Sequence, residues 1–196
     1  MRSKGLTPPQ AARRERMVQT TLALAVEGGW DAVQMREVSA RADVAVGTLY
    51  RYFPSKENLL VSVMLEQIRA LAEQMARRPA TADSGAERVD EVLRRANTTL
   101  QTYPMVTTAM IRALVSGNTD VAPVVSQVRD EMSGLLAAAY ADRGEVTDAD
   151  RLRIGLLSDV WLATLVSWIS GTAAPESVSS RLSDAVGVLL DDRTIP

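Results

Sequence analysis

The sequence predicts an all-α fold of about nine helices, and three observations support this fold class. Apolar residues recur at the spacing of one helix face in successive segments of the 196-residue chain. Aromatic residues make up 4% of the chain, and Ala, Val and Leu supply most of the 46% that is hydrophobic, which favours helix over sheet. Pro and Gly separate the segments, as helix starts and stops do. We expect a small N-terminal domain over residues 1–55 and a larger helical domain over residues 56–196.

The first helix is expected to begin after Thr7, a good N-cap, with Pro8 at its first position. The pair Gly28-Gly29 would end it. Trp30 then starts the connection to the second helix, where we expect it to fill the core.

Two short helical patterns follow, separated by a tight polar break. The first has its apolar face at Met35, Val38 and Ala42, and the second at Val46, Leu49 and Phe53. Two short helices joined by about three or four residues form a helix-turn-helix, whose second helix can enter the major groove of DNA.

The outward face of the second short helix indicates contact with nucleic acid. Gly47 costs about 1 kcal/mol of helix stability relative to Ala, and would let another backbone come close. Thr48, Tyr50, Arg51 and Tyr52 offer hydroxyls and a guanidinium, which suit base edges and phosphates.

Pro54 ends this helix, and Ser55 is a good N-cap for a fourth one. Lys56 would then stand in the first turn, where a cation opposes the helix dipole. A bound phosphate would reverse that effect, because helix N-termini bind anions. We therefore expect Lys56 to contact DNA.

These residues carry a resemblance to a known family. The segment AVGTLYRYFPSKENLL resembles the recognition helix and fourth-helix start of TetR-family repressors. Within that family, VQMREVSARADVAVGTLYRYFPSK and SDVWLATLVSWI resemble the KstR-type repressors of steroid catabolism. The resemblance implies a homodimer on a double-stranded operator, DNA contact by Arg36, and a steroid acyl-CoA thioester as effector.

The remaining helices are expected at residues 56–77, 86–102, 105–116, 120–142 and 149–171, and from residue 175 onward. Thr147 and Asp150 resemble a capping box at the start of the eighth helix. The fourth helix is long enough to leave the small domain and enter the larger one, so it is the expected lever between them.

The eighth helix is apolar almost all round, and such a helix must be buried on all sides. The ninth helix alone cannot cover it, so we expect a homodimer through both helices. The expected interface residues are Leu156, Val160, Val178, Leu182, Ala185, Val186 and Leu189.

A DNA-only protein would not need so large a helical body, which suggests that the body binds a ligand. Methionine adapts to apolar ligands, and pockets are mostly apolar with few polar groups. The candidate pocket residues are Met64, Gln67, Tyr103, Met105, Met110, Leu114, Asp159, Trp161 and Trp168. Any one of these Met or Trp residues is more often plain core than a ligand contact.

Charge is divided along the chain. Residues 1–60 hold nine basic and six acidic residues, a net charge of +3. The rest of the chain has a net charge of −5, which gives the total of −2. A basic N-terminal part on an acidic body is expected of a nucleic-acid-binding head.

The composition limits the chemistry. The chain has no Cys and no His, which removes disulfides, Ser-His-Asp and Cys-His catalysis, and the usual zinc sites. We expect no enzyme activity, no metal and no cofactor. Residues 1–10 lack the apolar core of a signal peptide, and the run 160–169 is too short to span a bilayer, so we expect a cytoplasmic protein without a membrane partner.

Three functions remain in competition. The first is a ligand-responsive repressor, the second an apolar-ligand carrier or lipid sensor whose head has another role, and the third an all-helical enzyme. Sequence-specific DNA binding separates the first from the second. Without His, Cys, a phosphate loop or a metal cluster, the third is disfavoured.

Overall fold

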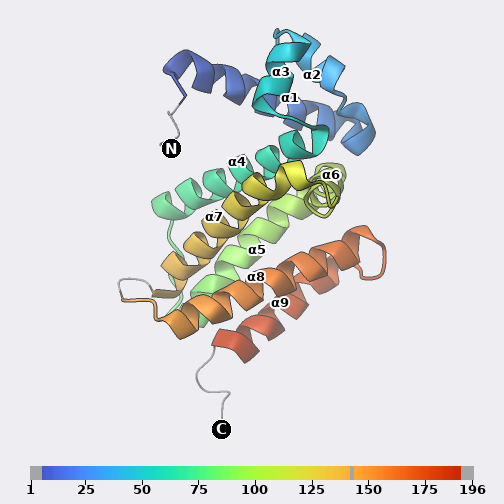
Figure 1. Ribbon diagram of the computed structural model, residues 1–196. Helices are drawn as coiled ribbons and strands as arrows, with labels where there is room; N and C mark the ends of the chain where they lie inside the picture. Colours follow the sequence, from blue (N-terminus) through green and yellow to red (C-terminus); the bar gives the residue numbers. More distant parts are fainter. Residues whose placement is uncertain (1–5, 142–143, 191–196) are drawn as a thin grey trace. The chain divides into compact units, whose positions relative to one another are not determined.

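The computed structural model describes residues 6–141 and 144–190, and within them the chain is all α-helical, as predicted. Figure 1 shows the elements in order. They are α1 (Pro8–Ala32), α2 (Met35–Arg41), α3 (Val46–Tyr52), α4 (Lys56–Arg77), α5 (Gly85–Thr102), α6 (Pro104–Leu114), the 3-10 turn η1 (Thr119–Val121), α7 (Ala122–Ala141), α8 (Asp148–Ile169) and α9 (Pro175–Leu190).

The first helix is interrupted where the sequence predicts its end. Gly29 has φ +60° and ψ −143°, and Gly28 before it is also non-helical. Only glycine adopts this backbone conformation without strain, so Gly29 lets the chain change direction just before Trp30. A last helical turn then follows, up to Ala32.

Local capping chemistry fixes several helix starts. Thr147 accepts a hydrogen bond from the Asp150 backbone N–H, and the Asp150 carboxylate accepts one from Thr147 N–H, which confirms the capping box of α8. Ser55 caps α4 as predicted, because its Oγ accepts from Asn58 N–H at 3.1 Å.

Other boundaries differ from the prediction by one to three residues. Helix α6 begins at Pro104, which fits a first helical turn because proline there loses no hydrogen bond. The segment expected to open α7 at Asp120 instead forms η1, in which the Asn118 side chain accepts from Asp120 N–H.

The chain divides into two compact units, residues 1–64 with 105–125, and residues 65–104 with 126–196. Helices α4 and α7 each contribute to both units. The first unit therefore contains α1, α2, α3 and α6, together with η1 and the beginnings of α4 and α7, and is larger than the expected domain of residues 1–55.

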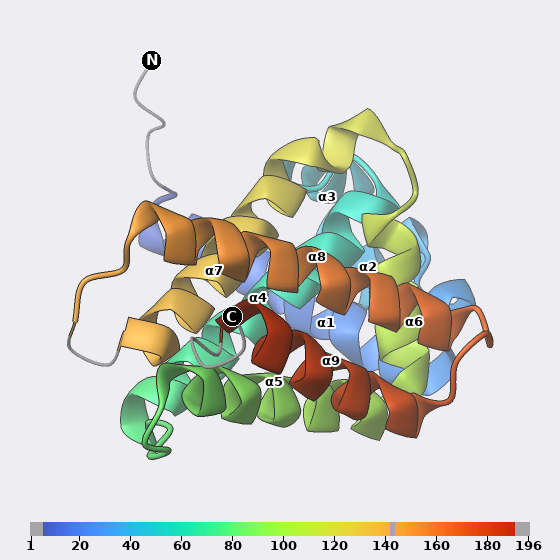
Figure 2. The same cartoon turned by 90° about the horizontal axis from the view of Figure 1, so that it is seen from below.

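The second unit contains the rest of α4 and α7, together with α5, α8 and α9. Helix α9 packs against both α5 and α8 (Figures 1 and 2). Its apolar stripe is buried against them, at Val178, Leu182, Val186 and Leu190. By length and composition α8 could also cross a bilayer, but core helices of soluble proteins have the same properties.

Candidate functional site

A tight turn joins α2 and α3. Asp43 adopts φ +51°, which lies in the left-handed region that Asp tolerates better than most residues. The Val44 N–H then donates to the Ser39 carbonyl at 3.0 Å. After the turn, Thr48 N–H and Leu49 N–H both donate to the Ala45 carbonyl, which begins α3. These bonds fix the geometry of the predicted helix-turn-helix.

Packing beneath α3 determines which of its residues face outward. Leu49 and Phe53 are buried at 0% and 1% exposure, and Val38 of α2 is also buried. The Arg14 guanidinium lies over the Phe53 ring at 5.4 Å. Val46, which was expected to face inward, is 38% exposed. It is the first residue of α3, one turn before the buried Leu49, and the core does not extend that far.

The remaining residues of α3 form the outward face, as predicted. A Cβ at Gly47 would meet no atom within 4 Å, so the helix backbone is open to a close approach. Tyr50 is 49% exposed, and Arg51 is exposed with its guanidinium 5.9 Å from the Tyr52 ring centroid. Thr48 and Tyr52 are half-buried.

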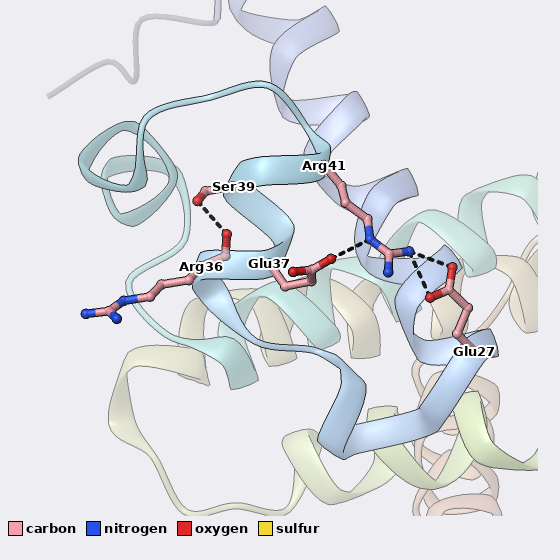
Figure 3. A network of polar contacts seen from close by, with 5 residues as sticks. All are labelled: Glu27, Arg36, Glu37, Ser39 and Arg41. Atoms are coloured by element: carbon pink, nitrogen blue, oxygen red, sulfur yellow. Dashed lines mark hydrogen bonds and ion pairs between the residues drawn. The ribbon is translucent and has the colours of Figure 1, made fainter.

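The two arginines of α2 have different surroundings. Arg41 pairs with Glu27 and Glu37, each at 2.6 Å, and these carboxylates raise the pKa of its guanidinium. In Figure 3 the Arg36 side chain points away from this cluster. Its backbone carbonyl accepts from the Ser39 hydroxyl at 2.8 Å, and its side chain is exposed.

Lys56 is held by Trp30. Its ammonium donates to the Trp30 carbonyl and lies 4.2 Å from the centroid of the indole ring. Burial lowers the pKa of Lys56, the Arg112 charge lowers it further, and Asp31 and Glu57 oppose the shift. The Lys56 side chain therefore already has a partner within the chain. If Lys56 contacts DNA as expected, it does so with this engaged side chain or with its backbone N–H at the start of α4.

The second unit contains a cavity of about 900 Å³ bounded by α4, α5 and α7. Its lining includes small or apolar residues from all three helices and from the loop after α4. They are Ala72, Met75, Ala76, Pro79, Ala80, Val92, Gly134, Leu135, Ala138 and Ala139. Polar groups are few, namely Arg88, Gln127, Asp130 and Glu131, which is typical of a site for a mainly apolar ligand.

Arg88, one of the lining residues, makes four hydrogen bonds. Its guanidinium donates to the carbonyls of Ala82 and Asp83 in the loop before α5, at 3.1 and 3.2 Å. It also donates to those of Ala139 and Tyr140 at the end of α7, both at 2.8 Å. Gly85 permits this approach, since a Cβ there would lie 2.6 Å from the Tyr140 carbonyl oxygen.

The nine residues expected to line a pocket have other surroundings, and their role as ligand contacts stays a prediction. Met64, Met110 and Trp161 are buried core, whereas Tyr103 and Met105 are each 50% exposed. Asp159 is exposed and pairs with Arg129 at 3.4 Å. Gln67, Leu114 and Trp168 are half-buried. None of the nine is among the residues that line the cavity.

Trp161 nonetheless takes part in a buried polar contact. Its indole N–H donates to Asn97 Oδ1 at 2.9 Å, and this bond fixes the orientation of the Asn97 amide. Asn97 Nδ2 is buried and has no partner among the described residues.

Sequence reasoning missed the cavity because its lining looks like ordinary helix surface. The usable signal was the small size of the residues on facing helices, Ala72 and Ala76 on α4 and Ala138 and Ala139 on α7. Small side chains leave space where helices face one another, but only the fold shows which faces meet.

The expected dimer residues fall into two groups. Leu156 and Val160 on α8 are 47% and 36% exposed. Leu152 of α8 and Val188 of α9, which were not among the expected residues, are also exposed, at 66% and 67%. Val178, Leu182 and Val186 are buried within the chain's own fold, and Ala185 and Leu189 are half-buried. The interface itself stays a prediction.

A helix-turn-helix with a polar outward face and a helical body with an apolar cavity define a DNA-binding regulator that responds to a ligand. The comparisons with known proteins agree. A family profile described as "Bacterial regulatory proteins, tetR family" matches residues 18–63, and one described as "Tetracyclin repressor-like, C-terminal domain" matches residues 82–189. The chain belongs to the TetR family and is a ligand-responsive transcriptional repressor.

Individual relatives support this assignment. The HTH-type transcriptional repressor KstR of Mycobacterium tuberculosis is 39% identical over 184 residues, which cover 94% of this chain and 83% of the relative. The crystal structure of a TetR transcriptional regulator from Rhodococcus sp. RHA1 has a TM-score of 0.83 at 32% identity, covering 95% and 99%. Thermus thermophilus FadR, in complex with lauroyl-CoA, shares the fold, with a TM-score of 0.73 at 17% identity and coverage of 93% and 96%.

Proposed function

We propose that the chain acts in the cytoplasm as a homodimer on a pseudo-palindromic operator, and that an acyl-CoA thioester releases it. The cavity is the observation that carries this proposal. Its volume of about 900 Å³ lies within the usual range for ligand sites, and its apolar lining suits a steroid or fatty acyl group. Similarity to KstR favours the steroid, and the fold shared with a FadR that binds lauroyl-CoA favours the thioester.

The charges of the cavity support one orientation of the effector. Asp130 and Glu131 line it, and Arg88 already donates to four carbonyls. Such a wall does not suit phosphates, because Asp130 repels them, Glu131 is already paired with Arg69 at 3.1 Å, and the lining cation Arg88 is engaged. The acyl group therefore enters the cavity, and the CoA phosphates stay in solvent.

On the DNA side, the proposed contacts come from Arg36, Gly47, Thr48, Tyr50, Arg51, Tyr52 and Lys56. The α3 residues face base edges in the major groove, and Arg36 and the start of α4 face phosphates. The half-sites are then about one or more helical turns apart.

The test is a fluorescence anisotropy titration of the protein bound to a duplex from its own promoter. Cholestenoyl-CoA and lauroyl-CoA are the probes, and free CoA is the control. We expect the thioesters to lower operator affinity and free CoA to leave it unchanged. Unchanged affinity at saturating concentrations of both thioesters would refute the effector proposal, and absence of sequence-specific binding would favour the carrier.

Filling the cavity should abolish the response without harming the fold. A Cβ at Gly134 in α7 would meet no atom within 4 Å, so Gly134→Phe can place its ring in the cavity. We expect operator binding to stay near the wild-type level, and thioester affinity to fall at least about tenfold, as excluded apolar contact requires. Gly134→Ala is the matched control, since it removes the glycine without filling the cavity. Equal responses from the two variants would show that the ligand binds at another site.

The exposed apolar residues of α8 provide the test of the dimer. Leu152 and Leu156 are 66% and 47% exposed, so Leu152→Asp and Leu156→Asp should leave the fold of each chain intact. A charge at a buried interface position is costly, and we expect monomers by light scattering. Thr98→Asp, an exposed change on α5, should stay dimeric. A dimer that survives both α8 substitutions must associate through a different face.

A further inference from the structure

The last turn of α3 carries Arg51 and Tyr52, and side-chain contacts fix its position. Helix α3 has seven residues, and helices this short depend on tertiary contacts because their nucleation is costly. The Phe53 N–H donates to the Leu49 carbonyl at 2.9 Å. Pro54 has no N–H, so the series of helix hydrogen bonds stops there. The direction of Arg51 therefore depends on how firmly Phe53 is held.

Four side chains from α1 and the end of α3 contact one another in series. The Arg14 guanidinium of α1 lies 5.4 Å from the centroid of the Phe53 ring. The Tyr52 ring is next to Phe53, with centroids 6.4 Å apart and planes tilted by 35°, and the Arg51 guanidinium lies 5.9 Å from the Tyr52 centroid. These separations fall within the ranges of aromatic pairs and of cation–π contacts. The four residues are called here the aromatic ladder.

Arg14 lies on the inward face of α1. It precedes the buried Met17 by three residues and the buried Val18 by four, so it shares their face, one turn nearer the N-terminus. Arg14 is half-buried, whereas Arg16 is exposed. A guanidinium stacks on an aromatic ring because it is planar and weakly hydrated. Arg14 therefore holds the Phe53 ring at the end of α3.

The direction of Arg51 matters for reading DNA. Its side chain is exposed and long, so it has many rotamers when nothing restricts it. Bidentate contact with a guanine edge needs the planar fork in one orientation. Restricting a side chain before it binds lowers the entropic cost of that contact. The Tyr52 ring supplies the restriction, and Phe53 with Arg14 holds that ring.

We propose that Arg14 is a positioning residue for base reading, because by holding Phe53 it fixes the last turn of α3 and the direction of Arg51. The base pair that Arg51 faces is then read through the aromatic ladder. The base pair that Thr48 faces is not, since Thr48 belongs to the first turn of α3. All four ladder residues belong to the first unit. This inference rests on the proposed DNA contacts and names the residue that sets specificity at one of them.

The first test measures specificity by anisotropy titration. It uses the promoter duplex and duplexes in which each base pair of one half-site is replaced in turn. Arg51→Gln identifies the base pair that Arg51 reads, as the position where discrimination is lost. Wild type should discriminate there by about 5- to 150-fold, which corresponds to one bidentate contact.

Arg14→Gln should relax that same base pair. We expect discrimination there to fall at least about threefold, and discrimination at the other positions to stay within about twofold of wild type. Adding Arg14→Gln to Arg51→Gln should have no further effect, because both changes remove one interaction. A wild-type pattern in Arg14→Gln overturns the proposal. An equal loss on every duplex also overturns it, because Arg14 then merely supports the fold.

Three variants separate the cation from packing and from net charge. Arg14→Lys keeps the cation and should discriminate within about twofold of wild type. Arg14→Met keeps an apolar cover on Phe53 without charge and should behave as Arg14→Gln. A wild-type pattern in Arg14→Met would show that packing alone holds the ring, and would overturn the proposal. Arg16→Gln removes an exposed charge from the same helix, and any loss there should be equal on every duplex.

Salt dependence distinguishes positioning from contact with a phosphate. Arg14→Gln should keep the slope of log affinity against log salt within about half a unit of wild type, because a positioning residue releases no counterion from DNA. Arg36→Gln, the proposed loss of one phosphate contact in each head, provides the comparison in the same titrations. A slope reduced as much in Arg14→Gln as in Arg36→Gln overturns the proposal in favour of a direct phosphate contact.

Side-chain motion provides a readout that needs no DNA. Order parameters of the arginine Nε–H groups, measured by NMR relaxation on protein with isotope-labelled arginine, report motion on the ps–ns timescale. In Arg14→Gln the order parameter should fall for Arg51 and stay unchanged for Arg36, which is outside the ladder. An unchanged value for Arg51 overturns the ladder and leaves the proposed DNA contacts intact. If Arg51→Gln itself relaxes no base pair, the proposed Arg51 contact fails, and the reading role of Arg14 is overturned with it.

Discussion

Replacing Arg36 by glutamine is expected to weaken operator binding by about 10- to 100-fold in a dimer, with the fold unchanged. The exposed guanidinium points away from the Glu27–Glu37–Arg41 cluster, and we propose that it contacts a phosphate. Each phosphate contact contributes about one unit to the slope of log affinity against log salt concentration. With one contact in each head, the slope should fall by roughly two units. Anisotropy titrations at several salt concentrations measure both quantities.

Arg41 is the matched control for this experiment. It lies on the same helix and carries the same charge, but its guanidinium is paired with Glu27 and Glu37. Arg41→Gln should change operator affinity less than about threefold, because exposed ion pairs contribute little to stability and the side chain is already engaged. Equal loss in the two variants would show that net charge, rather than the Arg36 contact, controls affinity.

The largest stability effect is expected for Arg88→Ala. Four carbonyls, from the loop before α5 and from the end of α7, would lose a charged donor. Because hydrogen bonds to charged groups contribute more than neutral ones, we expect the free energy of unfolding to fall by about 2–5 kcal/mol. At about 2–4 °C per kcal/mol for a chain of this size, Tm should drop by roughly 5–15 °C. Urea unfolding followed by circular dichroism measures the change.

Arg94→Ala on the same helix is the comparison for Arg88. Arg94 is 60% exposed and pairs with Asp90 at 3.3 Å, an interaction expected to contribute less than about 1 kcal/mol. A similar loss in both variants would mean that Arg88 acts only as another surface arginine. A larger loss for Arg88 would support its role in joining the loop before α5 to the end of α7.

The features predicted well from the sequence are those encoded locally. The positions of Leu49 and Phe53 fixed the buried face of α3, and Thr147 with Asp150 marked the start of α8. Periodicity and capping involve residues within one or two turns of each other, so the sequence contains the whole signal. Val46 was misassigned because periodicity does not show where a core ends.

The site was predicted unevenly for the same reason. The outward residues Gly47, Tyr50 and Arg51 follow from the helix period once the inward face is known. The contact of Lys56 with Trp30 joins residues 26 positions apart, and no local pattern indicates it. The expected pocket was placed mainly on Met, Trp and other large residues, whereas five of the fourteen residues that line the cavity are alanines.

By itself, the sequence determined the all-α class, the order of the helices, the helix-turn-helix and the resemblance to TetR-family repressors. The tertiary structure alone decided three other points. It placed the cavity between α4, α5 and α7, buried Val178, Leu182 and Val186 while leaving Leu152 and Leu156 exposed, and directed Lys56 to Trp30. Helices are specified by neighbours along the chain. The position of a cavity, the exposure of a helix face and the partner of a charged side chain depend instead on residues that meet only after folding.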